Sequence, residues 1–499
     1  MAAAGGSAIS FCSALTIMLS TGAARHATWQ QPRPHRLWRR WTCARRLDGG
    51  RGARLAVAQQ QQGERQRAQV EQARRRADSD DVHKKKVAIR LGYVGTGYRG
   101  LQVNRQCPGE TVEDVLETAL FKAGMIRESN YKDLSKIKWA RSSRTDKGVH
   151  SLATVISCKL EVKRGVLESD PEGQAFVHRV NDHLPQDVRV FSISRTNKGF
   201  SAQTQCEERT YDYFLPRAAF GGEHAQERLE KFGRALRQFE GVHSFHNFTK
   251  RKIYQKAADE RSARLLKRRG GTRSGSGSAS GQEVEPKDER LCAAKSRRVE
   301  ESRLAEEAGI IYWQHDFNPN DRVVQEFYRK VHRFGYAEET IGSTRVIRVT
   351  VAAGSFMYHQ IRKMIGTACA IALGHLPDDM VPVLLAAPCR AITPLAPGEP
   401  LVLSAAEFNA FRTGDGSVGQ RLVLGPSAEE NLRQLENEQI LPEIKRLLTQ
   451  EDGSMDYWIG SGGNLAEQIG NHLPRREVEE AIRWHREWQA DARAPDANV

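Results

Sequence analysis

Two stretches of low sequence complexity restrict where this 499-residue chain can build a hydrophobic core. Residues 1–84 are rich in Arg and Pro and continue into "AQQQQGERQRAQVEQARRRADSDD", while residues 251–308 are rich in Lys, Arg and Glu around "GGTRSGSGSASG". Such segments hold too few apolar side chains to offset the conformational entropy lost on folding. We therefore expect a disordered basic leader over 1–84 and a charged low-complexity insertion over 251–308.

The remaining sequence is expected to form two halves of one domain, 85–250 and 309–427, followed by a charged helical tail over 428–499. Alternating β-branched and aromatic residues predict strands at 84–94, 151–162, 187–196, 209–215 and 343–353. Apolar residues at helical spacing predict helices at 110–124, 226–241 and 355–374. Thr111 is the expected N-cap of the first helix. Several strands lie close together in sequence, so the pattern favours an α+β fold with a mixed or antiparallel sheet.

The net charge of +15 suggests a polyanionic partner such as RNA, DNA or an acidic membrane surface. The charge is unevenly distributed, because residues 1–84 hold 15 Lys and Arg against 6 Asp and Glu. Much of the basicity can therefore belong to a leader and need not form a binding face.

Residues 1–47 contain no acidic residue and carry seven arginines. That composition is typical of a transit peptide for a mitochondrion or chloroplast. Two alternatives stay open: a nuclear or cytoplasmic protein with no cleaved leader, and a secreted protein whose apolar region would be "AISFCSALTIML". No stretch of about 20 apolar residues predicts a membrane-spanning helix, and no membrane partner is expected.

The eight cysteines show no C-x-x-C spacing, and no histidine cluster completes a zinc-binding pattern. We expect neither a structural metal nor a disulfide framework.

The motif "GTGYRG" (95–100) fits the G-x-G-x-x-G pattern of dinucleotide-binding enzymes. In that fold a helix must begin within the motif so that its N-terminus meets the pyrophosphate. Here the next helix is expected only near Thr111, so a glycine-rich turn is the favoured interpretation. A nucleotide-dependent oxidoreductase remains an alternative.

The stretch "SSRTDKGVH" (142–150) contains Asp146, the one acidic residue in a basic neighbourhood. The surrounding cations are Lys136, Lys138, Arg141, Arg144, Lys147 and Lys159. An acid followed by Lys-Gly is also typical of an ordinary turn. A cation such as Arg144 beside the carboxylate would stabilise its ionised form, which can act as a nucleophile or base. In this interpretation the cations hold a phosphodiester chain and Asp146 performs the chemistry.

The same stretch closely resembles the signature G-R-T-D-x-G-V-H of the TruA family of tRNA pseudouridine synthases. Five further blocks resemble that family in the same order: "LGYVGTGYRGLQ", "VNDHLPQDVRV", "FSAQTQCEERTYDYFL", "GVHSFHNFT" and "GSFMYHQIRKMIG". Together they cover roughly 87–250 and 322–405, and the Lys-Gly and the insertion look more like the eukaryotic branch. Ser143 and Val94 depart from the family's usual Gly and Asp.

The resemblance implies two ferredoxin-like halves sharing a mixed, largely antiparallel sheet with a central cleft. It implies isomerisation of uridine to pseudouridine in tRNA, with no cofactor or metal and with the target base flipped out of its stack. Other RNA substrates and the oligomeric state are left open.

The resemblance also implies the site residues. Asp146 is the catalytic carboxylate, either as nucleophile or as base, and Arg362 would pair with it. Tyr211 would stack on the uracil and Arg144 would help to hold the flipped nucleotide. Thr145, His150 and Tyr211 are the expected substrate-binding residues. The main alternative is a non-catalytic RNA-binding protein on the same fold.

Overall fold

The computed structural model describes residues 82–163, 166–250, 313–314, 323–387, 389–410, 421–449, 454–459, 464–470 and 475–493. All of these residues belong to one structural unit, Arg75–Val499. The expected insertion over 251–308 and the expected leader over 1–84, except for its last three residues, lie outside the described residues.

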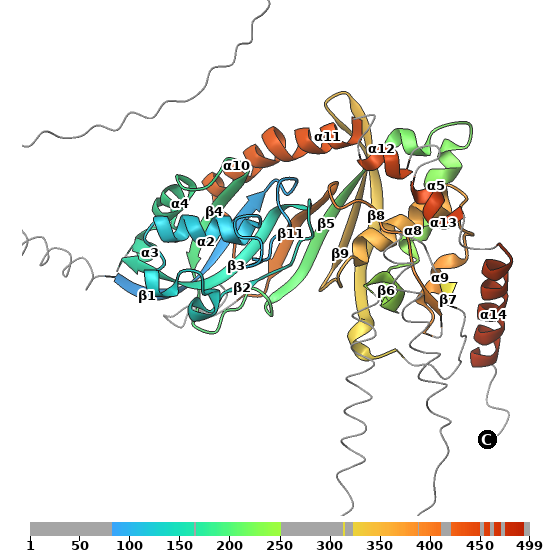
Figure 1. Cartoon of the computed structure of the whole chain (residues 1–499), viewed down its shortest axis with the longest axis horizontal. Helices are drawn as coiled ribbons and strands as arrows, with labels where there is room; N and C mark the ends of the chain where they lie inside the picture. The colour runs from blue at the N-terminus through green and yellow to red at the C-terminus, as the bar shows by residue number, and fades with distance from the viewer. Residues whose placement is uncertain are drawn as a thin grey trace, which may run out of the picture. The chain divides into compact units, whose positions relative to one another are not determined.

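A nine-stranded mixed sheet organises the described chain, in the order β4-β1-β3-β11-β5-β9-β8-β6 with β2 paired to β3 (Figure 1). Its strands are β1 (Val82–Tyr93), β2 (Ala140–Arg141), β3 (His150–Lys163), β4 (Val188–Arg195), β5 (Cys206–Pro216), β6 (Gly241–Ser244), β8 (Tyr328–Ile341), β9 (Thr344–Ala353) and β11 (Leu401–Phe408). Every pair is antiparallel except β3–β11. The expected α+β fold with a mixed, largely antiparallel sheet is confirmed.

Each half of the sheet is a βαββαβ unit, the ferredoxin-like arrangement. The first runs β1, α2 (Val112–Lys122), β2, β3, α4 (Gln174–Asn181) and β4, with strand order β4-β1-β3-β2. The second runs β5, α5 (Ala225–Arg237), β8, β9, α8 (Gln360–Ala372) and β11, with strand order β11-β5-β9-β8. The two halves therefore repeat one topology, and β6 extends the edge of the second.

The halves join where β3 of the first runs parallel to β11 of the second. Only two residue pairs are in register at this joint, Val402 with His150 and Leu403 with Ser151. On its other side, β11 pairs antiparallel with β5, where Leu403 lies opposite Tyr211. The loop that enters β3 therefore lies beside the middle of β5.

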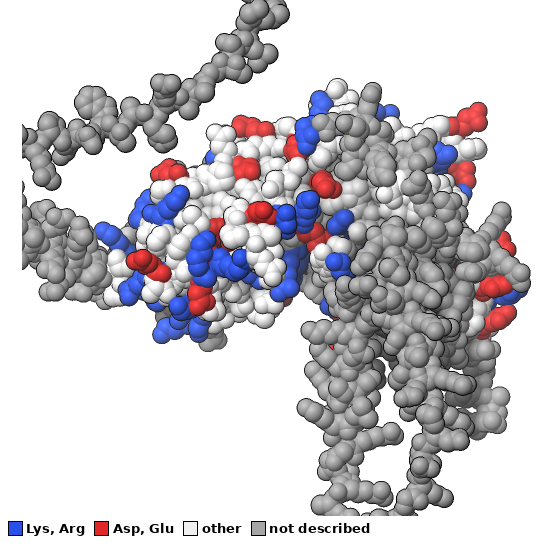
Figure 2. Space-filling model, in the orientation of Figure 1, with Lys and Arg blue, Asp and Glu red and all other residues white. Residues whose placement is uncertain are grey.

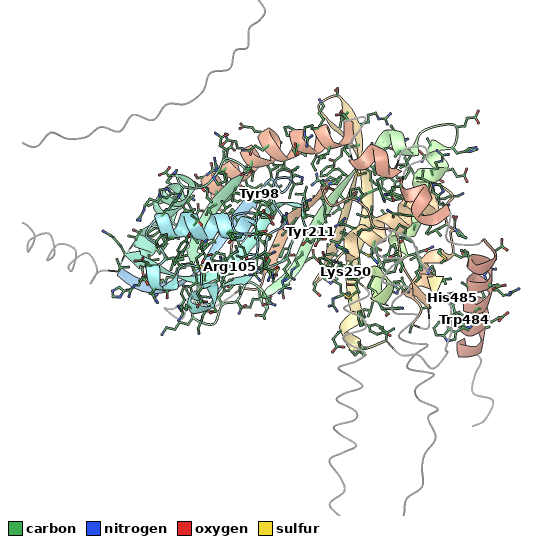
Figure 3. All side chains as sticks on the ribbon, in the orientation of Figure 1. Tyr98, Arg105, Tyr211, Lys250, Trp484 and His485 are labelled. Atoms are coloured by element: carbon green, nitrogen blue, oxygen red, sulfur yellow. The ribbon has the colours of Figure 1, made fainter. Side chains whose placement is uncertain are left out.

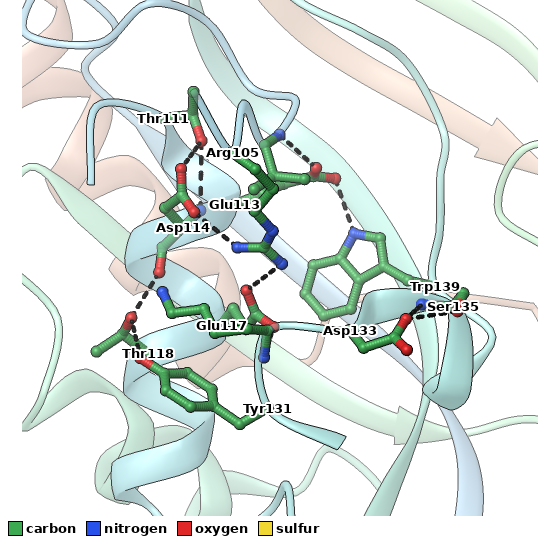
Figure 4. Close-up of polar contacts among 12 residues, drawn as sticks. Arg105, Thr111, Glu113, Asp114, Glu117, Thr118, Tyr131, Asp133, Ser135 and Trp139 are labelled. Carbon is green, nitrogen blue, oxygen red and sulfur yellow. Dashed lines mark hydrogen bonds and ion pairs between the residues drawn. The ribbon is translucent and has the colours of Figure 1, made fainter. Parts of the chain in front are cut away.

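The helix α2 begins where the sequence predicts, with the Thr111 side chain accepting a hydrogen bond from the backbone of Asp114. The apolar side chains of Val112, Leu116, Ala119 and Leu120 are buried, but so are the acidic residues Glu113, Asp114 and Glu117. Figure 4 shows how these acids are satisfied by polar partners around the helix. Arg105 binds Asp114 and Glu117, while Glu113 accepts hydrogen bonds from Trp139 and Arg141. Buried carboxylates persist only with such partners.

The helix α8 begins five residues later than the sequence pattern predicts. His359 immediately precedes it with a φ of 66°, and residues 355–359 form a loop. A histidine in left-handed backbone conformation cannot continue a right-handed helix. The later start places Arg362 in the first turn of α8.

The tail is helical where the structure describes it. A continuous helix is formed by α10 (Pro426–Leu435), a π-helical turn (Glu436–Ile440) and α11 (Leu441–Thr449). It runs from the first half to the second (Figure 1): α10 contacts β1 and β4, and α11 contacts β5 and β8. Its Glu443 accepts a 2.8 Å hydrogen bond from Thr96, so the tail supports the "GTGYRG" turn.

Shorter elements complete the fold. They are α3 (Val166–Ser169), α9 (Met380–Leu385), α12 (Ser454–Ile459), α13 (Asn464–Gly470), α14 (Arg475–Arg493) and the short pair β7 (Trp313–Gln314) and β10 (Arg390–Ala391). None of the helices that the structure describes has the length and apolar character needed to cross a membrane.

The glycine at position 95 generates a testable prediction. A Cβ added there would lie 2.0 Å from the backbone oxygen of Val149, in the segment that follows Asp146. Gly95→Ala should therefore lower the free energy of unfolding by about 1–3 kcal/mol, because the packed loop must shift. Chemical denaturation with urea measures this change.

Gly97→Ala in the same motif is the matched control, since its added Cβ would have no neighbour within 4 Å. It should change the free energy of unfolding by less than about 0.5 kcal/mol. Equal effects of the two substitutions would mean that the close approach at Gly95 is unimportant for stability.

Candidate active site

A cavity of about 990 Å³ opens at the joint between the halves. The first half contributes the loop 141–146, and the second contributes the loop and first helical turn 355–362. Its base includes Arg209 and Tyr211 from β5. The two halves therefore form one cleft, and each supplies a different wall.

Asp146 lies on the first wall, in the loop between β2 and β3. Its Oδ2 is 3.3 Å from Nη1 of Arg362 and 3.6 Å from Nε2 of His359. The Arg362 guanidinium is itself fixed by a 2.7 Å hydrogen bond from its Nε to the backbone oxygen of Ala396. Both nitrogens approach Oδ2, so neither Arg362 nor His359 contacts the other carboxylate oxygen, Oδ1.

Two opposing effects set the proton affinity of Asp146. Burial raises the pKa of its carboxyl group above the ordinary value, while the positive charge of Arg362 lowers it. Burial is the larger effect. The ion pair with Arg362 therefore limits the increase in the pKa of Asp146 that burial causes.

Arg144 is not the cation that contacts the Asp146 carboxylate, although it closely precedes Asp146 in the sequence. Its side chain is exposed at the wall of the cleft, and the cation in contact with Asp146 is Arg362. A cation in water is strongly screened, whereas the Arg362 side chain is only 14% exposed and acts at short range. The structure thus brings Arg362 to Asp146, as the resemblance implied, and leaves Arg144 free to contact a ligand.

Tyr211 lies at the base of the cleft on β5, with 4% of its surface exposed. Its hydroxyl is 2.5 Å from Oγ of Ser143, and its ring packs edge-on against Phe356. Burial raises the pKa of the Tyr211 phenol, which keeps it protonated. Ser143, one of the two departures from the family pattern, is therefore the residue that orients this hydroxyl.

Thr145 lines the cleft, and its hydroxyl is 2.8 Å from the hydroxyl of Tyr93. The structure does not bring His150 to the cleft. This histidine is fully buried, and its Nδ1 accepts a hydrogen bond from the backbone of Gly95. Burial lowers the pKa of His150 to about 4, so the ring is neutral. Its position supports the glycine-rich turn and excludes direct contact with a ligand in the cleft.

The "GTGYRG" turn packs against the Asp146 loop. The backbone of Leu101 donates to Thr145, and the backbone of Gly148 donates to Tyr98. The next α-helix begins at Val112. The turn therefore holds a loop in place, and no helix N-terminus is available within it for a pyrophosphate.

Sequence reasoning missed His359. Its side chain is 11% exposed, and burial together with the charges of Arg362, Lys363 and Lys250 lowers its pKa to about 3. The imidazole beside Asp146 is thus neutral. The helical periodicity of the segment hid this residue, because a positive φ leaves no signal in apolar spacing.

Arg209 was also missed, and it holds the cleft together. Arg209 is 7% exposed, and its guanidinium directs all five N–H donors at backbone carbonyl groups. Nε and Nη2 donate to Ser142, Nη1 donates to Cys206 and Gly354, and Nη2 also reaches Gln203. Ser142 precedes Asp146, and Gly354 precedes the loop that carries His359. One side chain therefore ties the two walls to each other.

Further cations surround the cleft. Figure 2 shows Lys and Arg side chains, with acids between them, over the visible face of the first half. Arg141 lines the cleft but is held by Glu113, with contacts of 2.5 and 2.9 Å.

In the part of the chain that the structure describes, no group of three or more His, Cys, Asp or Glu side chains is arranged to hold a metal ion.

Comparisons with known proteins agree on one family. A family model described as tRNA pseudouridine synthase matches residues 314–409. Pseudouridylate synthase 1 homolog of Mus musculus is 27% identical over 389 residues, which cover 76% of this chain and 74% of the relative. tRNA pseudouridine synthase 1 of Yarrowia lipolytica is 28% identical over 387 residues, 70% of each chain. That of Eremothecium gossypii is 45% identical over 139 residues, 28% of this chain and 24% of the relative.

The contacts of Arg209 predict how the cleft responds to its loss. Arg209→Ala should lower the free energy of unfolding by about 3–5 kcal/mol, because it leaves buried carbonyl groups without donors. Amide hydrogen exchange should also become faster in 142–146 and 354–359, which the guanidinium connects. Denaturation and exchange followed by mass spectrometry measure both effects.

The control is Arg348→Ala, which removes a 2.7 Å ion pair with Asp212 between β9 and β5 and lies outside the lining of the cleft. It should destabilise the protein without selective exchange in the two loops. Added guanidinium at low millimolar concentration should raise the melting temperature of Arg209→Ala alone. Unchanged exchange in both loops would refute the connecting role of Arg209.

Proposed function

The chain contains a pseudouridine synthase domain of the TruA type, and we propose that it isomerises uridine to pseudouridine in tRNA with Asp146 as the reacting carboxylate. The observation that carries this proposal is the position of Asp146, paired with Arg362 across a cleft that both halves build. The names of the matched relatives support tRNA as the substrate. The enzyme is accordingly an isomerase.

The reaction rearranges bonds within one nucleotide. The bond between N1 of uracil and C1′ of ribose breaks, the base turns, and a bond forms between C5 and C1′. The proton on C5 leaves and N1 gains one, so atoms and charge balance without an oxidant or reductant. An ionised carboxylate can serve this sequence by attacking C1′ or by removing a proton from the sugar.

The surroundings of Asp146 suit that role. Arg362 and His359 both approach Oδ2, which leaves Oδ1 as the oxygen that acts on the sugar. His359 is neutral, so it adds no second positive charge beside the reacting groups. Arg362 favours the ionised carboxylate in a partly buried site, where its charge acts strongly.

A uridine reaches this carboxylate only by leaving its stack. The Asp146 side chain is 18% exposed and lies inside the cleft, so a base held within a helix stays out of its reach. Tyr211, which Figure 3 labels on β5, lines the cleft and offers an aromatic surface to the flipped uracil. Arg144, exposed on the same wall, is placed to hold the phosphate of that nucleotide.

The first test replaces the reacting carboxylate. Asp146→Asn should lower the single-turnover rate of pseudouridine formation by at least ~10³-fold, because the amide neither attacks nor accepts a proton. Affinity for RNA should stay within about threefold, since the cations that bind phosphates remain. Unmodified tRNA transcripts, carbodiimide labelling and primer extension reveal the product, and filter binding gives the affinity.

Asp182→Asn, which changes an exposed carboxylate outside the cleft, should behave as the wild type. Binding of RNA without pseudouridine formation by either protein would favour the alternative, a non-catalytic RNA-binding protein on this fold. An equal loss of binding and rate in Asp146→Asn would make Asp146 a structural residue.

The ion pair predicts a pH dependence. Arg362 lowers the pKa of Asp146, so Arg362→Met should raise that pKa and reduce the ionised fraction at a given pH. The acid limb of the profile of kcat/KM against pH should therefore move upward by about one unit. Arg362→Lys, which keeps a cation, should move it less.

Arg348→Met, which removes a cation from outside the cleft, should leave the limb in place. If the limb of Arg362→Met coincides with that of the wild type, then Asp146 is not the group whose ionisation controls the rate.

A further inference from the structure

The mouth of the cleft carries an exposed aromatic ring that the reaction itself does not use. Among the described residues, the exposed large hydrophobic side chains are Val242, Tyr358 and Val423, and Tyr358 is the aromatic one at 42% exposure. A single exposed ring is common on protein surfaces and needs no explanation by itself. Tyr358, however, lines the same cavity as Asp146, and its surroundings fix it in place.

The ring of Tyr358 is held in a defined orientation. It stacks on the imidazole of His359 with ring centroids 3.8 Å apart and an interplanar angle of 26°. The backbone oxygen of Tyr358 accepts a 3.1 Å hydrogen bond from the buried Thr249. A ring that is already ordered loses little conformational entropy when a second ring stacks on it.

A cation accompanies the ring. The Nζ of Lys250 lies 5.1 Å from the centroid of Tyr358, and Figure 3 labels this lysine on the second half of the chain. Arg144 is exposed on the opposite wall of the same cleft. An aromatic surface beside an ammonium group is the combination that binds single-stranded nucleic acid, since the ring takes a base and the cation takes a phosphate.

The ring lies next to the reacting group without occupying its place. His359, the next residue in the chain, approaches Asp146 to 3.6 Å, whereas Tyr211 is the aromatic side chain buried at the base of the cleft. A base on Tyr358 therefore belongs to a neighbour of the uridine that Asp146 acts on. A phosphate alone would need only the cation for binding. The aromatic ring beside that cation therefore points to a nucleobase that is bound together with its phosphate.

We propose that Tyr358 and Lys250 form a binding subsite for the unpaired nucleotide immediately adjacent to the target uridine. Tyr358 stacks on its base, and Lys250 moves from the ring to its phosphate. The subsite therefore favours target uridines whose neighbouring base is unstacked. This inference rests on the proposed function, because it needs an RNA strand in the cleft.

The test first maps one target uridine on an unmodified tRNA transcript with the wild-type protein. Transcripts carrying 2-aminopurine immediately 5′ or immediately 3′ of that uridine are then titrated with the full-length Asp146→Asn protein. Stacking on Tyr358 should quench the fluorescence at one of the two positions. Adding Tyr358→Ala should abolish that quench and weaken binding about tenfold. Adding Tyr358→Phe, which keeps the ring, should retain the quench.

Tyr131→Ala is the matched control. Tyr131 also stacks on a ring, that of Phe121 at 4.2 Å, and lies under a lysine, Lys132 at 4.8 Å, but it does not line the cleft. It should leave the quench and the affinity unchanged. Tyr358→Leu keeps apolar bulk without an aromatic face and should also lose the quench, which guards against a folding defect in Tyr358→Ala.

A quench and an affinity that are the same with and without the Tyr358 ring would overturn the subsite while leaving the proposed function intact. Absence of pseudouridine in every transcript incubated with the wild type would overturn the proposed function and the subsite together.

Discussion

The joint between β3 and β11 is the constraint on which the cleft depends. It contains two residue pairs, yet it fixes the first half of the domain against the second. Asp146 lies in the loop before β3 on one side of this joint, and Arg362 lies in the first turn of α8 on the other. A shift of one residue in this register would turn the side chains of one strand to the opposite face and separate the two charges. The position of Asp146 is therefore set by sheet topology.

Several supports reinforce this short joint. Arg209 connects the two walls through backbone carbonyl groups, and the tail helix contacts strands of both halves. The glycine-rich turn and His150 hold the Asp146 loop from beneath. The Arg209 guanidinium has an acceptor for each of its donors, and the Gly95 backbone donates to His150, so the cleft is held in place before any ligand arrives. In the proposed reaction, this prior ordering would lower the cost of placing a flipped base against Asp146.

Sequence reasoning was most successful where local chemistry determines structure. The Thr111 cap, the strands and the α+β class follow from side-chain periodicity and capping, which act over a few residues. The proximity of Asp146 and Arg362 was predicted from resemblance to a family, since no local sequence pattern connects residues so far apart in the chain. His359 and Arg209 were missed because a positive φ and a set of carbonyl contacts leave no periodic signal. The burial of Glu113 and its neighbours was missed for a related reason, because their partners are distant in the sequence.

The ion pair across the cleft also has a genetic consequence. Asp146 and Arg362 are separated by 216 positions in the chain, yet each is the charge that makes burial of the other tolerable. Loss of either residue leaves its partner's charge unpaired. A second substitution, at the partner position, therefore adds little further loss, because the ion pair is already gone. Variants at the two positions are therefore epistatic: the phenotype of the double variant falls short of the sum of the two single effects. The two repeats of the fold thus cannot diverge independently at these positions, although each is a complete βαββαβ unit.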